Sequence, residues 1–329
     1  RVRRQRQMCI RDRKKIQMNE GVCPAYSDCR MGLSPDKFIL SYCDRALGIT
    51  SAEEQPVLPK GNNLSLHLLE LFTSQVAKVG MTDGIRQVLQ EESDALRAYY
   101  EQAGILIARP AGGTSCRLAI SAKGGTNAEN HNHNDVGSYA VALGSETMVG
   151  DQGGPNSYPG DYFNGDAPQK YKIKGSFGHP VPVVDGRTQS SGGKAKGVVL
   201  QKEFTNEKDV FSIDYTSAYS TPNLDKLIRT FVYDRQGKGS FTVGDEFTAK
   251  TPIRFETAIT TRADWKILDD THLLLATDSE QMIVAIEASG KVAFTSETIE
   301  VNSPAYTRIG IALKNQSKEG YIRLKMYTK

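Results

Sequence analysis

The sequence predicts an α+β protein, with a few helices first and a large antiparallel β-sandwich after them. Two observations support this class. Apolar residues recur at helical spacing between about residues 34 and 100, and short runs rich in Val, Ile, Thr, Phe and Tyr then follow one another to the C-terminus. Because the two kinds of element are segregated along the chain rather than alternating, an α/β fold is not expected.

Three amphipathic helices are expected in the first part. One begins at Ser34-Pro35-Asp36, the second covers Leu64–Val79, and the third begins at Asp83 and runs to Leu96. Helices with one apolar face need a partner surface, and three of them make only a thin domain. We therefore expect further helices upstream in the full-length protein, so that this chain is a truncated one.

The strand-like runs begin near residue 100. The first are GILIARP, RLAISA and GSYAVALGSETMV, and ten more follow residue 195 at intervals of about 10–15 residues. This places an antiparallel sandwich domain at residues 101–329 and a helical domain at residues 16–100. Residues 1–15 are predicted to be a disordered or non-native basic tip.

The charge of the chain excludes a basic nucleic-acid binder. The net charge is +3, but residues 1–15 alone hold eight basic and one acidic residue, and the rest holds 33 basic and 37 acidic ones. No apolar run approaches the roughly 18–20 residues of a membrane span. We therefore expect neither a nucleic-acid partner nor a transmembrane segment.

Two histidines lie close together in the segment NHNHND, residues 130–135. On a strand, positions two apart face the same side, so His131 and His133 are predicted to point into one site. Asp151 follows the next strand-like run, and His179 lies in a loop between Gly and Pro. His133, Asp151 and His179 form a candidate site for a divalent cation, preferably Zn²⁺, with a position left for water or substrate.

Two separated blocks of this region resemble one enzyme family. HNHNDVGSYAVALGSETMVGDQG and the later GSFGHPVPVVDG are similar, in order and spacing, to the heparinase II/III family of polysaccharide lyases. The resemblance covers about residues 100–329. It implies an enzyme that cleaves uronic-acid polysaccharides, such as heparan sulfate or alginate, in the periplasm or outside the cell. It also implies that the helices before residue 100 are the end of an (α/α) toroid.

The resemblance assigns roles to particular residues. The residues that match the family's metal ligands, usually for zinc, are His133, Asp151 and His179. His131 matches a histidine that reaches the substrate, and Tyr162 matches a catalytic tyrosine, with Tyr158 as its alternative. The family's other catalytic groups lie on the toroid, upstream of the residues present here.

The chemistry of such a lyase indicates what these residues would do. A base removes the C5 proton of a uronate, an acid protonates the leaving O4 oxygen, and donors neutralise the carboxylate. His131 and Tyr162 are candidates for acid and base, and a nearby positive charge would have to lower the tyrosine pKa from about 10. Asn132 or Asn134 is a candidate donor to the uronate, whereas Asp135 is expected to orient a neighbouring group.

Four basic residues near the cation loop are candidates for holding an anionic polymer: Lys170, Lys172, Lys174 and Arg187. An equally good interpretation of residues 170–174 is an edge strand with alternating solvated charges. The cation itself is expected to brace the loops more than to act as a Lewis acid.

Two other interpretations stay open. One is a non-catalytic carbohydrate-binding or structural sandwich whose metal only braces loops. The other is a zinc hydrolase, which the absence of an HExxH-like arrangement disfavours. The oligomeric state is also open, with a homodimer as one option.

Overall fold

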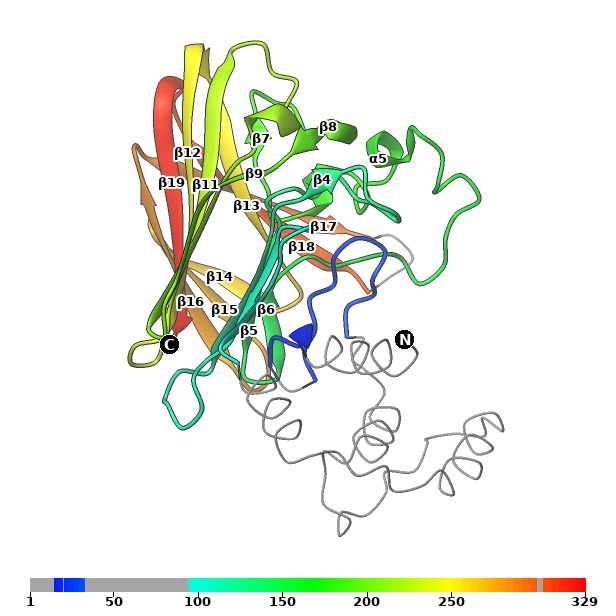
Figure 1. The fold of residues 1–329 in the computed structure, drawn as a ribbon. Helices are drawn as coiled ribbons and strands as arrows, with labels where there is room; N and C mark the ends of the chain where they lie inside the picture. Colours follow the sequence, from blue (N-terminus) through cyan, green and yellow to red (C-terminus); the bar gives the residue numbers. More distant parts are fainter. Residues whose placement is uncertain (1–14, 20, 33–94, 301–303) are drawn as a thin grey trace, which may run out of the picture. The chain divides into compact units, whose positions relative to one another are not determined.

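The computed structural model describes residues 15–19, 21–32, 95–300 and 304–329. The chain divides into two compact units, and the larger one comprises Met18–Leu33 and Leu96–Lys329. The basic tip, apart from Lys15, and the three expected helices, apart from Ala95 and Leu96 of the third, lie outside the described residues. Within the larger unit the regular secondary structure is mostly antiparallel β-sheet, with almost no helix among the described residues (Figure 1).

A five-stranded sheet has the order β1-β2-β3-β5-β6, with every neighbouring pair antiparallel. Its strands are β1 (Arg97–Tyr100), β2 (Ile105–Ala108), β3 (Leu118–Lys123), β5 (Tyr139–Leu143) and β6 (Glu146–Val149). Strands β3 and β5 are buried on both faces. One face packs on the main core, and Met18 and Val22 pack against alanines on the other face.

An eight-stranded sheet has the order β14-β15-β16-β19-β12-β11-β10-β9. Its strands are β9 (Val198–Phe204), β10 (Lys208–Asp214), β11 (Leu224–Asp234), β12 (Ser240–Ile253), β14 (Asp264–Asp269), β15 (His272–Ala276), β16 (Gln281–Ala288) and β19 (Ser317–Thr328). Along β11, Leu227, Arg229, Phe231 and Tyr233 are buried, because alternate residues of a strand face the same side. This two-residue alternation places Arg229 inside the core.

A four-stranded sheet and a two-stranded sheet complete the unit. The four-stranded sheet, in the order β17-β18-β13-β7, consists of β17 (Val292–Ile299), β18 (Tyr306–Leu313), β13 (Phe255–Thr261) and β7 (Val183–Val184). The two-stranded sheet pairs β4 (Thr126–Asn127) with β8 (Gly192–Lys196). Short helical pieces are α5 (Ala167–Lys170), η1 (Ser176–Gly178) and η2 (Thr216–Ala218).

One hydrophobic core joins the three larger sheets. It includes Leu118 of β3, Phe241 of β12 and Ile309 of β18, all buried. Figure 1 shows the eight-stranded sheet as a layer that faces the other two. Among the residues that the structure describes, no helix has the length and apolarity needed to cross a bilayer.

The strand-like runs predicted from the sequence coincide with observed strands, with two kinds of difference. Strand β1 begins at Arg97, before the boundary placed at residue 100, and the strands that were not predicted are β1, β4, β7, β8 and β14. The predicted edge strand at residues 170–174 is wrong, because α5 ends at Lys170 and turns follow it. The division into three domains stays a prediction.

Candidate metal centre

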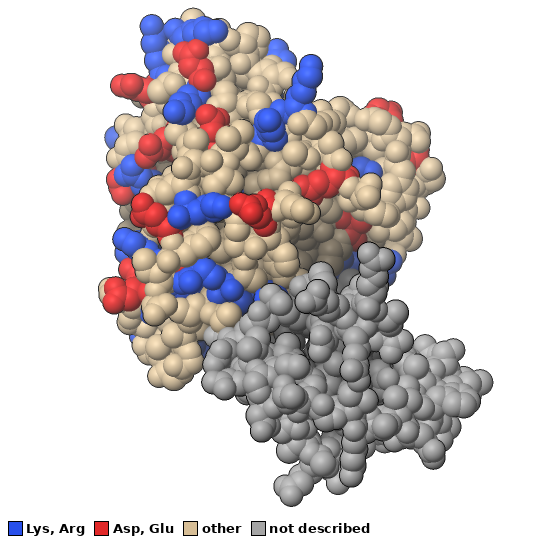
Figure 2. All heavy atoms as spheres, in the orientation of Figure 1, with Lys and Arg blue, Asp and Glu red and all other residues tan. Residues whose placement is uncertain are grey.

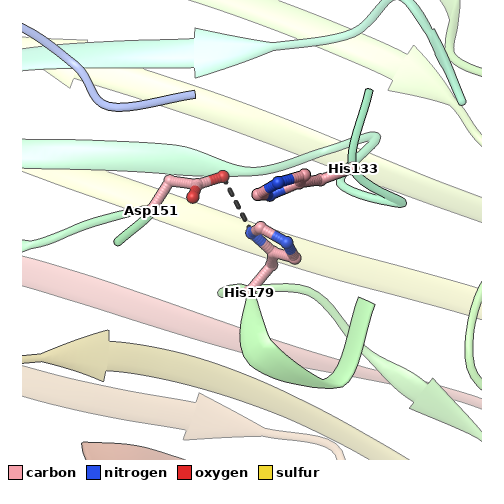
Figure 3. Close-up of side chains that lie close together, drawn as sticks. All are labelled: His133, Asp151 and His179. Carbon is pink, nitrogen blue, oxygen red and sulfur yellow. Dashed lines mark hydrogen bonds and ion pairs between the residues drawn. The ribbon is translucent and has the colours of Figure 1, made fainter. Parts of the chain in front are cut away.

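His133, Asp151 and His179 converge in the interior of the sheet unit (Figure 3). One potential ligand atom from each lies within 4.8 Å of the other two. All three side chains are buried, and the two imidazole rings lie 5.3 Å apart. Nδ1 of His179 is 2.8 Å from Oδ2 of Asp151. The structure thus brings together the three residues that the sequence predicted as ligands.

The unpaired nitrogens of this group fit a metal ion. Nδ1 of His133 and Nε2 of His179 are buried, and neither has a hydrogen-bond partner among the described residues. A buried polar atom without a partner costs about 1–3 kcal/mol, so two in one place indicate a missing ligand. Imidazole nitrogens with a carboxylate suit zinc, although other divalent cations also accept this set.

Burial and neighbouring charges set the protonation of each member of the group. Burial lowers the pKa of His133, so this ring is neutral near pH 7. Burial opposes the charged form of His179 too, but the charge of Asp151 and its hydrogen bond outweigh this and raise the pKa of His179. Burial by itself would raise the pKa of Asp151, but His179 lowers it, so Asp151 stays ionised.

Backbone contacts position Asp151 and His179. Asp151 follows β6, where Gly150 exchanges hydrogen bonds with Thr260 of β13: its N–H donates to the carbonyl oxygen at 3.0 Å, and Oγ1 donates back at 2.6 Å. His179 follows η1, where the hydroxyl of Tyr306 donates to the Gly178 carbonyl at 3.0 Å. Both candidate ligands therefore directly follow a residue that is hydrogen-bonded to a neighbouring strand.

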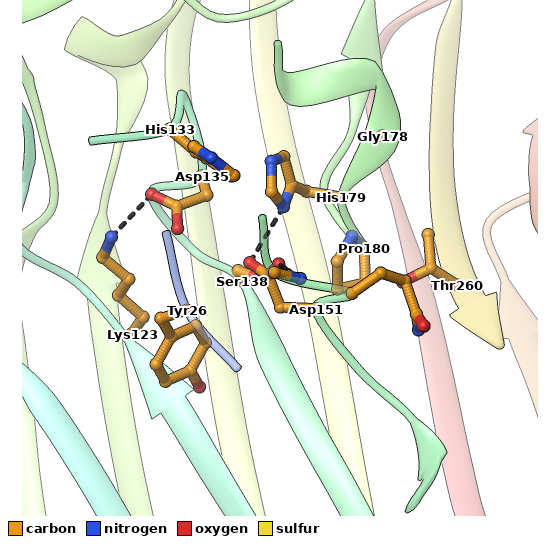
Figure 4. A network of polar contacts seen from close by, with 12 residues as sticks. Tyr26, Lys123, His133, Asp135, Ser138, Asp151, Gly178, His179, Pro180 and Thr260 are labelled. Atoms are coloured by element: carbon orange, nitrogen blue, oxygen red, sulfur yellow. Dashed lines mark hydrogen bonds and ion pairs between the residues drawn. The ribbon is translucent and has the colours of Figure 1, made fainter. Parts of the chain in front are cut away.

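His133 lies in a loop, so the prediction of a strand through residues 131 and 133 is wrong. The segment between β4 and β5 consists of turns and irregular backbone, and His131 has a left-handed φ of 57°. The backbone of this segment does not pair in a sheet, and its polar side chains make specific contacts. Asp135 accepts a hydrogen bond from the buried Lys123 at 2.6 Å (Figure 4), in agreement with its expected orienting role.

Two of the predicted site residues differ in exposure. The side chain of His131 is 68% exposed. Tyr162 is fully buried, and its hydroxyl lies 2.9 Å from Nε2 of His133. Burial and the negative charge of Asp28 raise the pKa of Tyr162, which is the opposite of the shift expected from the sequence. In this position Tyr162 supports His133, and Tyr158 is the exposed tyrosine of the pair.

The two asparagines also differ. Asn134 is buried, and its amide donates to Ser191 Oγ at 3.0 Å and to the Gln189 carbonyl at 3.3 Å. Asn132 is half-buried, and its Oδ1 has no partner among the described residues. Oδ1 of Asn134 also has no partner among the described residues, so the lower burial of Asn132 is what makes it the better placed of the two to contact a ligand.

The candidate basic residues do not form a free cationic patch. Lys170 and Lys172 pair with Asp161 and Glu297, respectively. Lys174 is buried and donates to the Tyr162 carbonyl at 2.6 Å, whereas Lys170, Lys172 and Arg187 are exposed. Figure 2 shows acidic and basic side chains interspersed over this face of the described residues.

Two residues beside the centre were not predicted from the sequence. The carboxylate of Asp28 lies 2.9 Å from His131 Nδ1 and 3.1 Å from His133 Nε2. Phe163 is 56% exposed, and its ring lies 5.0 Å from that of Tyr158. The tyrosine-rich segment around residue 160 was a usable signal for Phe163, whereas no local pattern indicated Asp28.

Comparison with known proteins agrees with this arrangement at the level of the fold. No family model and no curated protein matches the chain. A solved heparinase III with methylated lysines matches with a TM-score of 0.64 and 13% identity, over 96% of this chain and 44% of that one. Another heparinase III structure matches with a TM-score of 0.61 and 15% identity, over 98% and 48%.

Heparan sulfate lyase HepC from Pedobacter heparinus matches with a TM-score of 0.64 and 13% identity, over 96% of this chain and 45% of that one. The chain therefore spans less than half the length of the structures it resembles. At such low identity the match concerns the fold alone. This chain has the fold of a part of the heparinase III structures, which confirms the resemblance predicted from its sequence.

Proposed function

We propose that this chain is part of a polysaccharide lyase that cleaves a uronic-acid polysaccharide, such as alginate or a glycosaminoglycan like heparan sulfate, by β-elimination. In this proposal the described unit is the β-sandwich, and the residues before it end an (α/α) toroid. The observation that carries the proposal is an exposed histidine, His131, held next to the buried His133–Asp151–His179 group. The shared fold with structures named as heparan sulfate lyases supports it.

His131 is suited to proton transfer. In β-elimination the C5–H bond breaks, a C4–C5 double bond forms, and the C4–O bond electrons leave with the glycosidic oxygen, which takes up a proton. Asp28 engages Nδ1 of His131, and none of the described residues hydrogen-bonds its Nε2. Nε2 is therefore the nitrogen available to accept the C5 proton.

The surroundings of His131 suit a sugar. The rings of Tyr158 and Phe163 are both partly exposed, and Phe163 meets His131 edge-on at 5.9 Å. Flat aromatic faces pack well against the apolar face of a sugar ring. Asn132, which is half-buried, is a candidate whose amide NH2 group can donate a hydrogen bond to the uronate carboxylate.

A bound zinc ion would supply positive charge and hold three separate loops together. Because His133, Asp151 and His179 are almost fully buried, we expect this role to be structural. The same burial favours the second candidate function, a metal-braced module that binds polysaccharide without cleaving it.

One experiment separates the two candidates. The natural protein in its full length is incubated with alginate and with glycosaminoglycans, and the ultraviolet absorbance of the new C4–C5 double bond is followed. We expect a rise that His131→Ala abolishes and that His272→Ala leaves intact, because His272 is a half-buried histidine of the β14–β15 hairpin, outside the candidate site. Retention of a polymer without any rise would exclude the lyase and favour the binding module.

A further inference from the structure

The carboxylate of Asp28 contacts two histidines of the candidate site at once. Its Oδ1 lies 3.1 Å from Nε2 of His133, and its Oδ2 lies 2.9 Å from Nδ1 of His131. Only 7% of the Asp28 side chain is exposed. We propose that Asp28 is a positioning residue that fixes the tautomer of His133 for metal binding and holds the His131 ring in place.

The first half of the inference follows from hydrogen-bond chemistry. An ionised carboxylate only accepts hydrogen bonds, so the neutral His133 ring carries its proton on Nε2 when it contacts Asp28. The lone pair is then on Nδ1, which is the buried atom without a partner among the described residues. Carboxylates that hold the second nitrogen of a metal-binding histidine orient the ring and raise its basicity.

The second half concerns His131 and rests on the proposed function. The His131 side chain is mostly exposed, and its backbone adopts the left-handed φ of 57°, which costs energy for a non-glycine residue. Its described side-chain contacts are Asp28 and the edge-on ring of Phe163. Asp28 therefore supplies the hydrogen bond that selects one orientation of the ring.

The backbone of the loop that follows Asp151 holds Asp28 in this position. The Gly154 N–H donates to the Cys29 carbonyl at 3.0 Å, and Arg30 forms a β-bridge with Gly153. A Cβ on Gly153, whose φ is +68°, would overlap the Cys29 carbonyl oxygen, so only glycine allows this close approach. The segment that carries Asp28 thus packs on residues directly after Asp151.

Tyr162 is the rival for the same role, because its hydroxyl also lies 2.9 Å from Nε2 of His133 and can accept a hydrogen bond. Replacing each residue separately distinguishes them. If Asp28 sets the tautomer, Asp28→Ala changes the protonation pattern of the His133 ring and Tyr162→Phe leaves it unchanged.

The chain contains only five histidines, so the test uses the whole chain labelled with ¹⁵N at histidine. In the metal-free protein, ¹⁵N shifts report which ring nitrogen carries the proton. The zinc Kd is measured separately by competition with a chelator. For Asp28→Ala we expect loss of the Nε2–H tautomer at His133 and a 10–100-fold weaker zinc Kd.

Two further variants complete the design. Asp28→Asn keeps the size and one acceptor oxygen, so it is expected to recover part of the affinity, and it remains informative if Asp28→Ala does not fold. Asp166→Asn, at an exposed position before α5, is the control and should match the wild type. A wild-type tautomer and zinc Kd in both Asp28 variants would overturn the inference.

These readouts are independent of lyase activity. Suppose that the full-length protein cleaves no uronate polymer but its Asp28 variants lose the Nε2–H tautomer of His133 and the zinc affinity. This result would refute the proposed function and support the role of Asp28 in metal binding. If the lyase is active, Asp28→Ala should lower kcat with little change in KM, because it misorients His131 without removing a substrate contact. A change confined to KM would refute the positioning of His131.

Discussion

Replacing Arg229 by methionine is expected to weaken both the fold and the candidate metal centre. Arg229 of β11 is fully buried, and its Nε and Nη2 donate to Asp245 at 2.7 and 2.6 Å. Its Nη1 donates to the carbonyl oxygens of Gly137 and Pro180 at 2.7 and 2.8 Å. These carbonyls belong to the two loops that carry the candidate histidine ligands, so one side chain fastens both loops to the sheet.

The magnitude follows from the burial of the pair. Without Arg229, Asp245 stays in the core with only the hydroxyls of Tyr215 and Thr257 as donors, at 2.6 and 2.7 Å. Removing one partner of a buried ion pair costs about 3–5 kcal/mol. The loop carbonyls also lose hydrogen bonds from a charged donor, which contribute about 1.5–3 kcal/mol each, so we expect the upper end of this range.

The assay combines urea unfolding of the metal-free protein with chelator competition for zinc. The matched control is Arg235→Met, because Arg235 also forms a buried pair, with Asp209, and donates to the carbonyls of Leu96 and Arg109 far from the metal loops along the sheet unit. Asp209 keeps a second ion pair with Arg97, so Arg235→Met should lose less stability than Arg229→Met, and only Arg229→Met should weaken zinc binding.

A stability loss below about 1 kcal/mol for Arg229→Met, or equal effects of both variants on the zinc Kd, would refute this reasoning. If the methionine variant is unfolded at the assay temperature, Arg229→Lys replaces it. Lysine keeps a charge for Asp245, but one ammonium group cannot reach the carboxylate and both carbonyls together.

Three other predictions concern the same unit. Chelation of the metal should lower the melting temperature, and free zinc at one hundred times its Kd should restore about 2.7 kcal/mol of stability, as read by calorimetry; an unchanged melting temperature would contradict a bound metal. Phe163→Ala should raise KM for the polymer more than it lowers kcat, whereas Ile267→Ala, an exposed apolar change on β14, should alter neither. Gly153→Ala should destabilise the protein in urea unfolding because of the overlap with Cys29, while Gly160→Ala, with open space around it, should be tolerated.

The strands were predictable because their signal is local. Alternation of apolar residues, as in Phe241 and Val243 of β12, is visible along each strand and does not depend on the partner strand. Residues 170–174 show the limit of such patterns. Their alternating charges are the same as those of an edge strand, but Pro168 sits at the start of α5 and each lysine finds its own partner.

The metal ligands were predictable because His, Asp and His are the residue types that the chemistry of zinc requires, and they stand next to recognisable strand ends. The orientation of the loop was not predictable in this way. The backbone of His131 turns through a left-handed conformation, and the side chains that reach His133 come from positions far along the chain.

The sequence by itself therefore determined the strand content, the resemblance to heparinase II/III and the identity of His133, Asp151 and His179 as candidate ligands. Only the tertiary structure decided that Asp28, 105 positions before His133, contacts His133. It also decided that Arg229 of β11 ties the two ligand loops together. The physical reason is that strand patterns and ligand types are local properties, whereas these contacts depend on which sheet faces pack together.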